Sequence, residues 1–182
     1  MMSKMLATLL ALLGFASLAM AATPEPSLFS ADGYRIDRYR SPTPAQADGA
    51  VTLDTPALQA LLERQPKPLL VDVYRLPWLH GRFVEDEPHR NIPGSLWLPN
   101  TGDGVLEPSW QNYLNRHLAA ATAGDKRRAI VFYCRSDCWL SWNSIRRARA
   151  LGYESLYWYR DGIDAWQQAG LPLQAAEPAP YP

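Results

Sequence analysis

The sequence predicts a single α/β domain with a parallel sheet flanked by helices. Short apolar runs alternate along the chain with amphipathic runs of helical period, and this alternation is typical of parallel strands joined by helices. The chain has 182 residues, of which 47% are hydrophobic, which suits one domain with a substantial core. In such a sheet, ligands gather at the carboxyl ends of the strands.

The first 21 residues predict a signal peptide. Lys4 supplies a positive charge, residues 5–18 are almost entirely apolar, and residues 19–21 fit a small-x-small cleavage site. An uncleaved membrane anchor is the alternative, because the apolar stretch is long enough to enter a bilayer. The cleavage site favours export and release. We therefore expect a periplasmic protein without a stable membrane anchor, in an oxidising compartment where thiols pair.

Charge, histidine spacing and motifs give no indication of a nucleic-acid or membrane partner, a metal site or a phosphate-binding loop. Lys and Arg number 18, Asp and Glu also number 18, and nothing in this balance indicates nucleic acid or an anionic membrane as a partner. His80, His89 and His117 are scattered and lack metal-ligand spacing. No Gly-rich phosphate loop is present. We therefore expect neither a metal nor a cofactor.

Six segments predict strands. Within an N-terminal extension at 22–49, residues 34–39 alternate weakly and predict a short edge strand. The run at 69–73 is almost continuously apolar, as expected for a strand that is covered on both faces. The strands expected in the main sheet are 50–53, 69–73, 96–98, 129–133 and 156–159.

Four amphipathic runs predict helices. The first begins with Thr55 as its cap and Pro56 in its first turn, and Pro66 ends it. The other three are followed by glycines, which commonly end helices; they cover 109–123, 141–151 and 163–169. Residues 174–182 form a C-terminal tail, whose proline-rich end predicts extended structure.

Both cysteines lie in one loop, between the strand at 129–133 and the helix that follows it. Cys134 therefore lies where a strand ends and a helix begins. The first turn of a helix presents unpaired N–H groups and the positive end of the helix dipole. These groups stabilise a thiolate, so Cys134 is the candidate nucleophile and Cys138 its partner thiol.

Four motifs, taken in order, resemble the rhodanese-like domain. Residues 70–73 (Leu-Val-Asp-Val) are similar to the family's strand ending in Asp-Val, and residues 91–95 (Asn-Ile-Pro-Gly-Ser) to its Ile-Pro-Gly turn. Residues 131–134 resemble the strand that delivers the catalytic cysteine, and residues 151–172 resemble the closing strand, turn and helix. The resemblance covers residues 50–173 and implies a rhodanese-like α/β fold.

The cysteine loop is more closely similar to the exported rhodanese-related proteins that are named for a CXXCW motif. Residues 134–139 have the sequence Cys-Arg-Ser-Asp-Cys-Trp, so the spacing here is Cys-x3-Cys-Trp. The likeness continues into Ser-Trp-Asn at 141–143 and into residues 96–100. That group is associated with alcohol catabolism dependent on pyrroloquinoline quinone (PQQ), and the resemblance implies the same context for this chain.

The resemblance also implies sulfur chemistry. In rhodaneses the cysteine holds a sulfane sulfur as a persulfide, which backbone N–H groups of the loop surround. Carried over to this chain, the substrate-binding residues are Arg135, Ser136, Asp137 and Trp139, with Cys138 among the cradle positions. Trp139 stands where the family usually has a substrate-binding arginine, and Asp137 replaces the usual glycine. Both changes argue against thiosulfate transfer, and the charge of Arg135 offsets them in part.

Two cysteines four residues apart in an oxidising compartment also predict a disulfide, provided that the loop brings their Cα atoms within about 4.4–6.8 Å. The enclosed loop is short, so the bridge adds little chain-entropy stability. We expect the bridge to lie exposed at the strand–helix junction and to act as a redox couple. An inert bridge that only holds the shape of the loop is the alternative.

Two function hypotheses follow. The first is sulfur transfer or thiol–disulfide chemistry on a small sulfur-containing or thiol substrate, with Cys134 and Cys138 as the catalytic residues. The second is a catalytically degenerate module whose Trp139 and Trp142 surface docks an exported protein partner, such as a quinoprotein dehydrogenase. Packing in the core is the simpler role for at least one of these tryptophans, and Trp142 is expected to stack on Arg146. For Asp72 we expect a structural role, bonded to the loop or to an arginine.

Overall fold

A computed structural model describes residues 27–181, and the predicted signal peptide at residues 1–21 lies outside this range. The centre of the fold is a parallel sheet of five strands, in the order β1-β8-β7-β2-β6. Its strands are β1 (Val51–Leu53), β2 (Leu69–Asp72), β6 (Leu96–Trp97), β7 (Ile130–Tyr133) and β8 (Leu156–Tyr159). The five strands predicted for the main sheet are confirmed.

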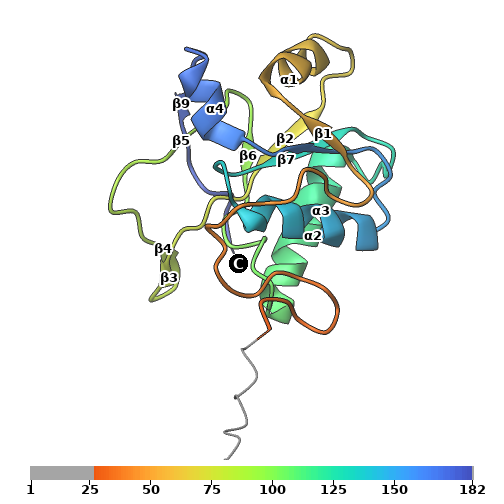
Figure 1. The fold of residues 1–182 in the computed structure, drawn as a ribbon. Helices are drawn as coiled ribbons and strands as arrows, with labels where there is room; N and C mark the ends of the chain where they lie inside the picture. Colours follow the sequence, from red (N-terminus) through yellow and green to blue (C-terminus); the bar gives the residue numbers. More distant parts are fainter. Residues whose placement is uncertain (1–26, 182) are drawn as a thin grey trace, which may run out of the picture.

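Four helices cover the two faces of this sheet (Figure 1). They are α1 (Thr55–Leu62), α2 (Pro108–Thr122), α3 (Trp139–Ala150) and α4 (Gly162–Gln168). One hydrophobic cluster joins α2 and α3 to the sheet through Phe132 and Trp158, and a second joins α1 and α4 through Val131 and Tyr159. Successive residues of a strand point to opposite faces, so the apolar runs of β7 and β8 supply both clusters. None of the helices within 27–181 is long and apolar enough to cross a membrane.

The predicted helices are confirmed, with corrections at their starts. Asp54, not Thr55, caps α1, because its Oδ1 accepts a hydrogen bond from the Ala57 N–H (2.8 Å). The Thr55 hydroxyl instead pairs with the Tyr159 hydroxyl (2.7 Å). Helix α3 begins at Trp139, two residues before the predicted 141, so the whole first turn of this helix adjoins the cysteine loop.

The edge strand predicted at 34–39 is wrong. The segment makes one isolated bridge, between Phe29 and Arg35, and the next residue, Arg40, makes another with Cys138. The Arg35 N–H donates to Asn143 Oδ1 of α3 (2.9 Å), and Asn143 Nδ2 donates to the Arg35 carbonyl (2.8 Å). A polar side chain of a helix therefore makes the hydrogen bonds that a neighbouring strand would have made.

Two short antiparallel pairs lie outside the main sheet. β3 (Trp78–Leu79) pairs with β4 (Arg82–Phe83), and β5 (Arg90–Asn91) pairs with β9 (Gln174–Ala175). The tail beyond β9 then follows β6, where the Ala179 N–H donates to the Trp97 carbonyl (2.9 Å). The C-terminal segment thus runs along the outer edge of the sheet.

Candidate redox site

The site is built on the loop between β7 and α3. β7 is the central strand of the sheet and is buried along its whole length, which places the following residue, Cys134, at the carboxyl edge. Cys134 and Cys138 form a disulfide whose Cα atoms are 6.2 Å apart. The predicted pairing of the two cysteines is therefore present in the structure.

The disulfide is buried, and the expectation that it lies exposed is wrong. Each cysteine is 2% exposed, because the N-terminal extension and the first turn of α3 close over the loop. The bridge nevertheless faces a cavity of about 270 Å³. The cavity is lined by Tyr39, Arg40, Tyr74, Arg75, Cys134, Arg135, Cys138 and Leu140. A small molecule in this cavity would contact both cysteines.

The start of α4 holds the first half of the loop. The Ile163 N–H donates to the Cys134 carbonyl (3.0 Å). Gly162, with φ +58°, approaches so closely that a Cβ atom there would lie 2.4 Å from the Cys134 carbonyl oxygen. Glycine is therefore required at position 162 both for its backbone conformation and for this contact.

Asp164 of α4 binds Ser136 and Arg135. Its Oδ2 accepts hydrogen bonds from the Ser136 N–H (3.0 Å) and the Ser136 hydroxyl (2.8 Å), and its Oδ1 lies 3.4 Å from Arg135 Nε. Burial works to raise the pKa of Asp164, but the bonds from Ser136 and the charge of Arg135 outweigh it and hold that pKa below its ordinary value. The carboxylate thus fixes one side of the loop while it is ionised.

The N-terminal extension holds the second half of the loop. The Trp139 N–H donates to the Tyr39 carbonyl (2.9 Å), the Ser41 N–H donates to the Asp137 carbonyl (3.2 Å), and Arg40 Nη1 donates to the Ser136 carbonyl. The N–H groups of Ser136 and Trp139 are both engaged in these contacts and those of Asp164. At two of the five predicted cradle positions, the backbone donor is thus already paired within the protein.

Asp137 has the left-handed backbone conformation (φ +49°). This conformation is easiest for glycine and is also tolerated by aspartate. Asp137 Oδ1 accepts from the Thr43 N–H (3.4 Å), and the side chain does not line the cavity over the disulfide. Aspartate therefore keeps the turn while its charge points toward the extension.

Trp139 points away from the cysteines. It is 8% exposed, its Nε1 donates to Ser41 Oγ (3.0 Å), and its ring packs against Phe29 (5.5 Å between centroids). The Arg35 guanidinium lies 4.7 Å from the same ring. Trp139 thus anchors the N-terminal extension. The predicted Trp142–Arg146 stack is present, at 5.2 Å.

A family model described as a rhodanese-like domain matches residues 55–169, which is more than half of the chain. This chain belongs to the rhodanese-like domain family. No curated protein matches it.

Several solved structures are similar at low sequence identity. A thiosulfate sulfurtransferase from Pseudomonas aeruginosa has 20% identity and a TM-score of 0.48, over 71% of this chain and 21% of that one. This chain thus spans about a fifth of the length of that protein. A polysulfide-sulfur transferase homodimer from Wolinella succinogenes has 17% identity and a TM-score of 0.45, over 71% and 81% of the two chains. A rhodanese-like domain from an Anabaena species has 18% identity and a TM-score of 0.46, over 73% and 86%.

The rhodanese-like domain carries a second group of polar residues that the sequence did not indicate. Asp72, at the end of β2, is 1% exposed, and its Oδ2 lies 2.7 Å from His89 Nε2. The imidazole stacks on Tyr74 (4.7 Å, 6° between planes) and contacts Trp97 (4.3 Å). Burial raises the pKa of Asp72, and the hydrogen bond from His89 opposes this effect. The expected partners of Asp72, the loop or an arginine, are thus replaced by a histidine.

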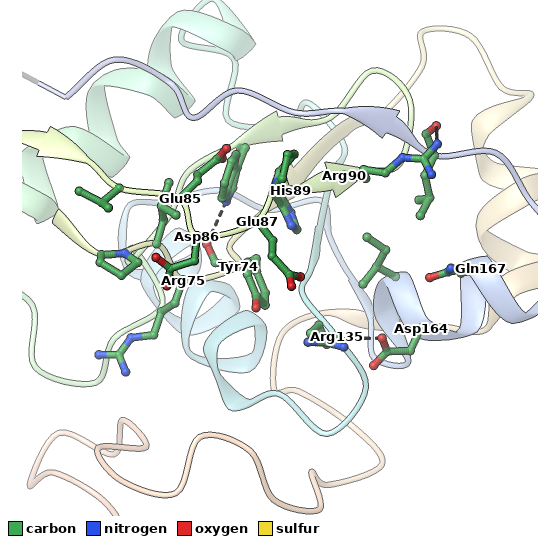
Figure 2. Close-up of a pocket in the computed structure, with 17 residues that line it drawn as sticks. Tyr74, Arg75, Glu85, Asp86, Glu87, His89, Arg90, Arg135, Asp164 and Gln167 are labelled. Atoms are coloured by element: carbon green, nitrogen blue, oxygen red, sulfur yellow. Dashed lines mark hydrogen bonds and ion pairs between the residues drawn. The ribbon is translucent and has the colours of Figure 1, made fainter.

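His89 lines a cavity of about 500 Å³ next to the redox site (Figure 2). Tyr74, Arg75 and Arg135 line both this cavity and the smaller one over the disulfide. From the sequence, the pairing of His89 with Asp72 could have been inferred only from their common location at the carboxyl edge of the sheet. The histidine follows 17 residues later in a loop, and no spacing rule connects the two.

Proposed function

We propose that the Cys134–Cys138 pair of this rhodanese-like domain is a working thiol–disulfide couple that reacts with small sulfur compounds. The observation that carries the proposal is the bridge itself, which faces a cavity large enough for a small molecule. Because the loop is so short, the disulfide stabilises the folded state by only on the order of 2 kcal/mol through chain entropy. Hydrogen bonds to Asp164 and to residues 39–43 also hold the loop, so we expect the fold to persist when the bridge is reduced.

Reduction proceeds by thiol–disulfide exchange in two steps. A thiolate attacks one sulfur of the bridge, forms a mixed disulfide with that cysteine, and expels the other cysteine as a thiolate. A second thiolate attacks the mixed disulfide, and the two small thiols leave joined as a disulfide. Two electrons pass from the small thiols to the bridge, and their two protons end on Cys134 and Cys138.

The same pair can serve sulfur transfer. In the dithiol form, Cys134 takes the outer sulfur of a persulfide or polysulfide, whose remaining thiol leaves, and holds it as Cys134–S–SH. Cys138 then attacks the inner sulfur, the Cys134–Cys138 bridge closes, and hydrogen sulfide leaves. Cys134 is the nucleophile and Cys138 the resolving thiol, and two small thiols return the bridge to the dithiol and leave as their disulfide.

Single-cysteine variants test this proposal with a glutathione persulfide donor. The reduced wild-type protein releases hydrogen sulfide and ends as the disulfide. Cys138→Ser keeps one extra sulfur atom on Cys134, which cyanide removes, and releases no hydrogen sulfide on its own. Cys134→Ser does neither, although its circular dichroism spectrum remains native. Release of hydrogen sulfide by Cys134→Ser at the wild-type rate would contradict the proposal.

We also propose that the protein is exported to the periplasm and works in PQQ-dependent alcohol catabolism. The apolar segment and cleavage site within residues 1–21 support export, and the likeness of residues 134–139 to the CXXCW group supports the metabolic context. N-terminal sequencing of the protein from a periplasmic fraction tests export, with Ala22 as the expected first residue. A mature protein that still begins at Met1 would contradict cleavage.

An accessory module for an exported quinoprotein is the second candidate function. The engagement of the Ser136 and Trp139 N–H groups favours it, because a persulfide cradle needs free donors. Of the docking surface predicted on Trp139 and Trp142, Trp139 is covered by residues of the extension, whereas Trp142 stays partly exposed beside Phe29. A strain that carries only Cys134→Ser/Cys138→Ser decides between the candidates. Normal growth on alcohol favours the accessory module and contradicts the thiol–disulfide couple, whereas lost growth has the opposite meaning.

A further inference from the structure

We propose that the cavity over the disulfide selects anionic thiols, and that Arg40 of the N-terminal extension is the residue that binds their charge. The proposal rests on the thiol–disulfide function and names the class of substrate. It goes beyond the family match, since Arg40 precedes residues 55–169.

The charge of the cavity lining carries the inference. Among its eight residues are three arginines, Arg40, Arg75 and Arg135, and no aspartate or glutamate. The remainder are two tyrosines, a leucine and the two cysteines of the bridge. A compound in this cavity is therefore surrounded by guanidinium groups with no acidic side chain in the same wall, and this arrangement favours a negative charge.

The three arginines differ in how far their charge is already neutralised. Arg75 Nε lies 2.9 Å from Asp103, and Arg135 Nε lies 3.4 Å from Asp164. Arg40 has no carboxylate within 4.0 Å among residues 27–181. Arg40 therefore carries the least compensated positive charge in the wall of the cavity.

The backbone and side chain of Arg40 are both fixed beside the bridge. Arg40 forms an isolated antiparallel bridge with Cys138, and its Nη1 donates to the Ser136 carbonyl. One edge of the guanidinium is thus held by the loop, and its other N–H groups are available to a ligand. The nearest acidic residue of the loop, Asp137, turns toward Thr43 and does not line the cavity.

Arg40 also supplies a positive charge that is missing from the loop because Trp139 stands where the family usually has an arginine. Trp139 turns toward Phe29 and Arg35 and brings no charge to the cysteines. The extension that Trp139 anchors through Ser41 also places Arg40 beside Cys138, where its side chain donates to the Ser136 carbonyl of the same loop. The least compensated of the three positive charges at the sulfur site thus comes from a segment outside the matched domain.

Reduction of the oxidised protein by three thiols tests the proposal: 2-mercaptoethanesulfonate (anionic), 2-mercaptoethanol (neutral) and cysteamine (cationic). Bridge opening is followed by acid quenching, alkylation and intact mass, and rates are compared per thiolate at low salt. We expect the anionic thiol to react about tenfold faster than the cationic one, with a difference that shrinks as salt is added. Equal rates for the three thiols would overturn the proposal.

Arg40→Gln and Arg38→Gln form a matched pair. Both remove one charge from the extension, and Arg38 is exposed and does not line the cavity. Arg40→Gln should slow the anionic thiol about fivefold and leave the neutral thiol within twofold, with Arg38→Gln near wild type. Equal losses in the two variants would overturn the role of Arg40. A bridge that none of the three thiols opens would instead contradict the proposed function itself.

Discussion

The two segments that flank the rhodanese-like match differ in what they touch. The N-terminal segment, 27–50, contacts the cysteine loop, whereas the C-terminal segment, 170–181, contacts the edge of the sheet. Both lie outside residues 55–169. The contrast indicates that the N-terminal segment belongs to the site and the C-terminal segment to the stability of the fold.

The contacts of the tail support this distinction. The Tyr113 hydroxyl, on a fully buried side chain of α2, donates to the Ala179 carbonyl (2.8 Å). Tyr181 closes an aromatic cluster with Trp78 and Trp110, at 4.7 and 4.0 Å between ring centroids. Neither these residues nor any other of the tail lines the cavity over the disulfide.

Truncation after Glu177 should have the largest effect on stability. The loss leaves the Tyr113 hydroxyl without its acceptor and removes Tyr181, and together these changes lower the free energy of unfolding by on the order of 3 kcal/mol. Urea unfolding measures the loss. The rate at which 2-mercaptoethanol opens the bridge should stay within twofold of wild type. A large change in that rate would break the distinction between the two segments.

Trp139→Phe should have a smaller effect on stability and a clear effect on the bridge. Phenylalanine keeps the contact with Phe29 and loses the Nε1 hydrogen bond to Ser41, which lowers the free energy of unfolding by about 1 kcal/mol. Because the extension then loosens over Cys138, the bridge should open severalfold faster with 2-mercaptoethanol. Trp142→Phe is the matched control, with no change in rate expected. An unchanged rate in both variants would contradict the view that the extension shields the disulfide.

Asp164→Asn should have the smallest effect, and that effect should depend on pH. The pKa of Asp164 is held below its ordinary value, so its contribution is fully present above that value and is lost as pH falls through the lowered pKa. The stability difference between wild type and Asp164→Asn should therefore be constant near pH 5–7, below about 1 kcal/mol, and should shrink in more acidic solution. Urea unfolding at several pH values measures it, with Asp86→Asn as a control for the loss of one charge. A difference that grows on acidification would show that the ionised carboxylate does not stabilise the loop.

Local patterns in the sequence were enough to predict the main sheet. The apolar runs at 69–73 and 129–133 predicted two buried strands, which lie side by side in the structure, and the second run delivers Cys134 to the carboxyl edge. The cysteine pairing could also be predicted, since it depends only on a short spacing and on loop geometry. These features rest on periodicity and on neighbours in sequence, which a sequence displays directly.

The surroundings of the bridge could not be predicted, because they depend on contacts distant in sequence. Cys138 pairs with Arg40, 98 positions earlier, and the Trp139 indole bonds to Ser41, also 98 positions away. The weak alternation at 34–39 predicted a strand. It carried no information on Asn143, whose side chain makes hydrogen bonds with the backbone N–H and carbonyl of Arg35. The Asp72–His89 pair was missed for the same reason.

The central claim is that Cys134–Cys138 is a redox couple and not a permanent brace, and its reduction potential tests this claim most directly. The protein is equilibrated in dithiothreitol buffers of graded potential, quenched in acid and alkylated, and the number of labels is read by intact mass. The account predicts a midpoint less negative than about −300 mV, with two labels added together in one two-electron step. A midpoint well below about −300 mV, in the range of structural disulfides, would contradict it.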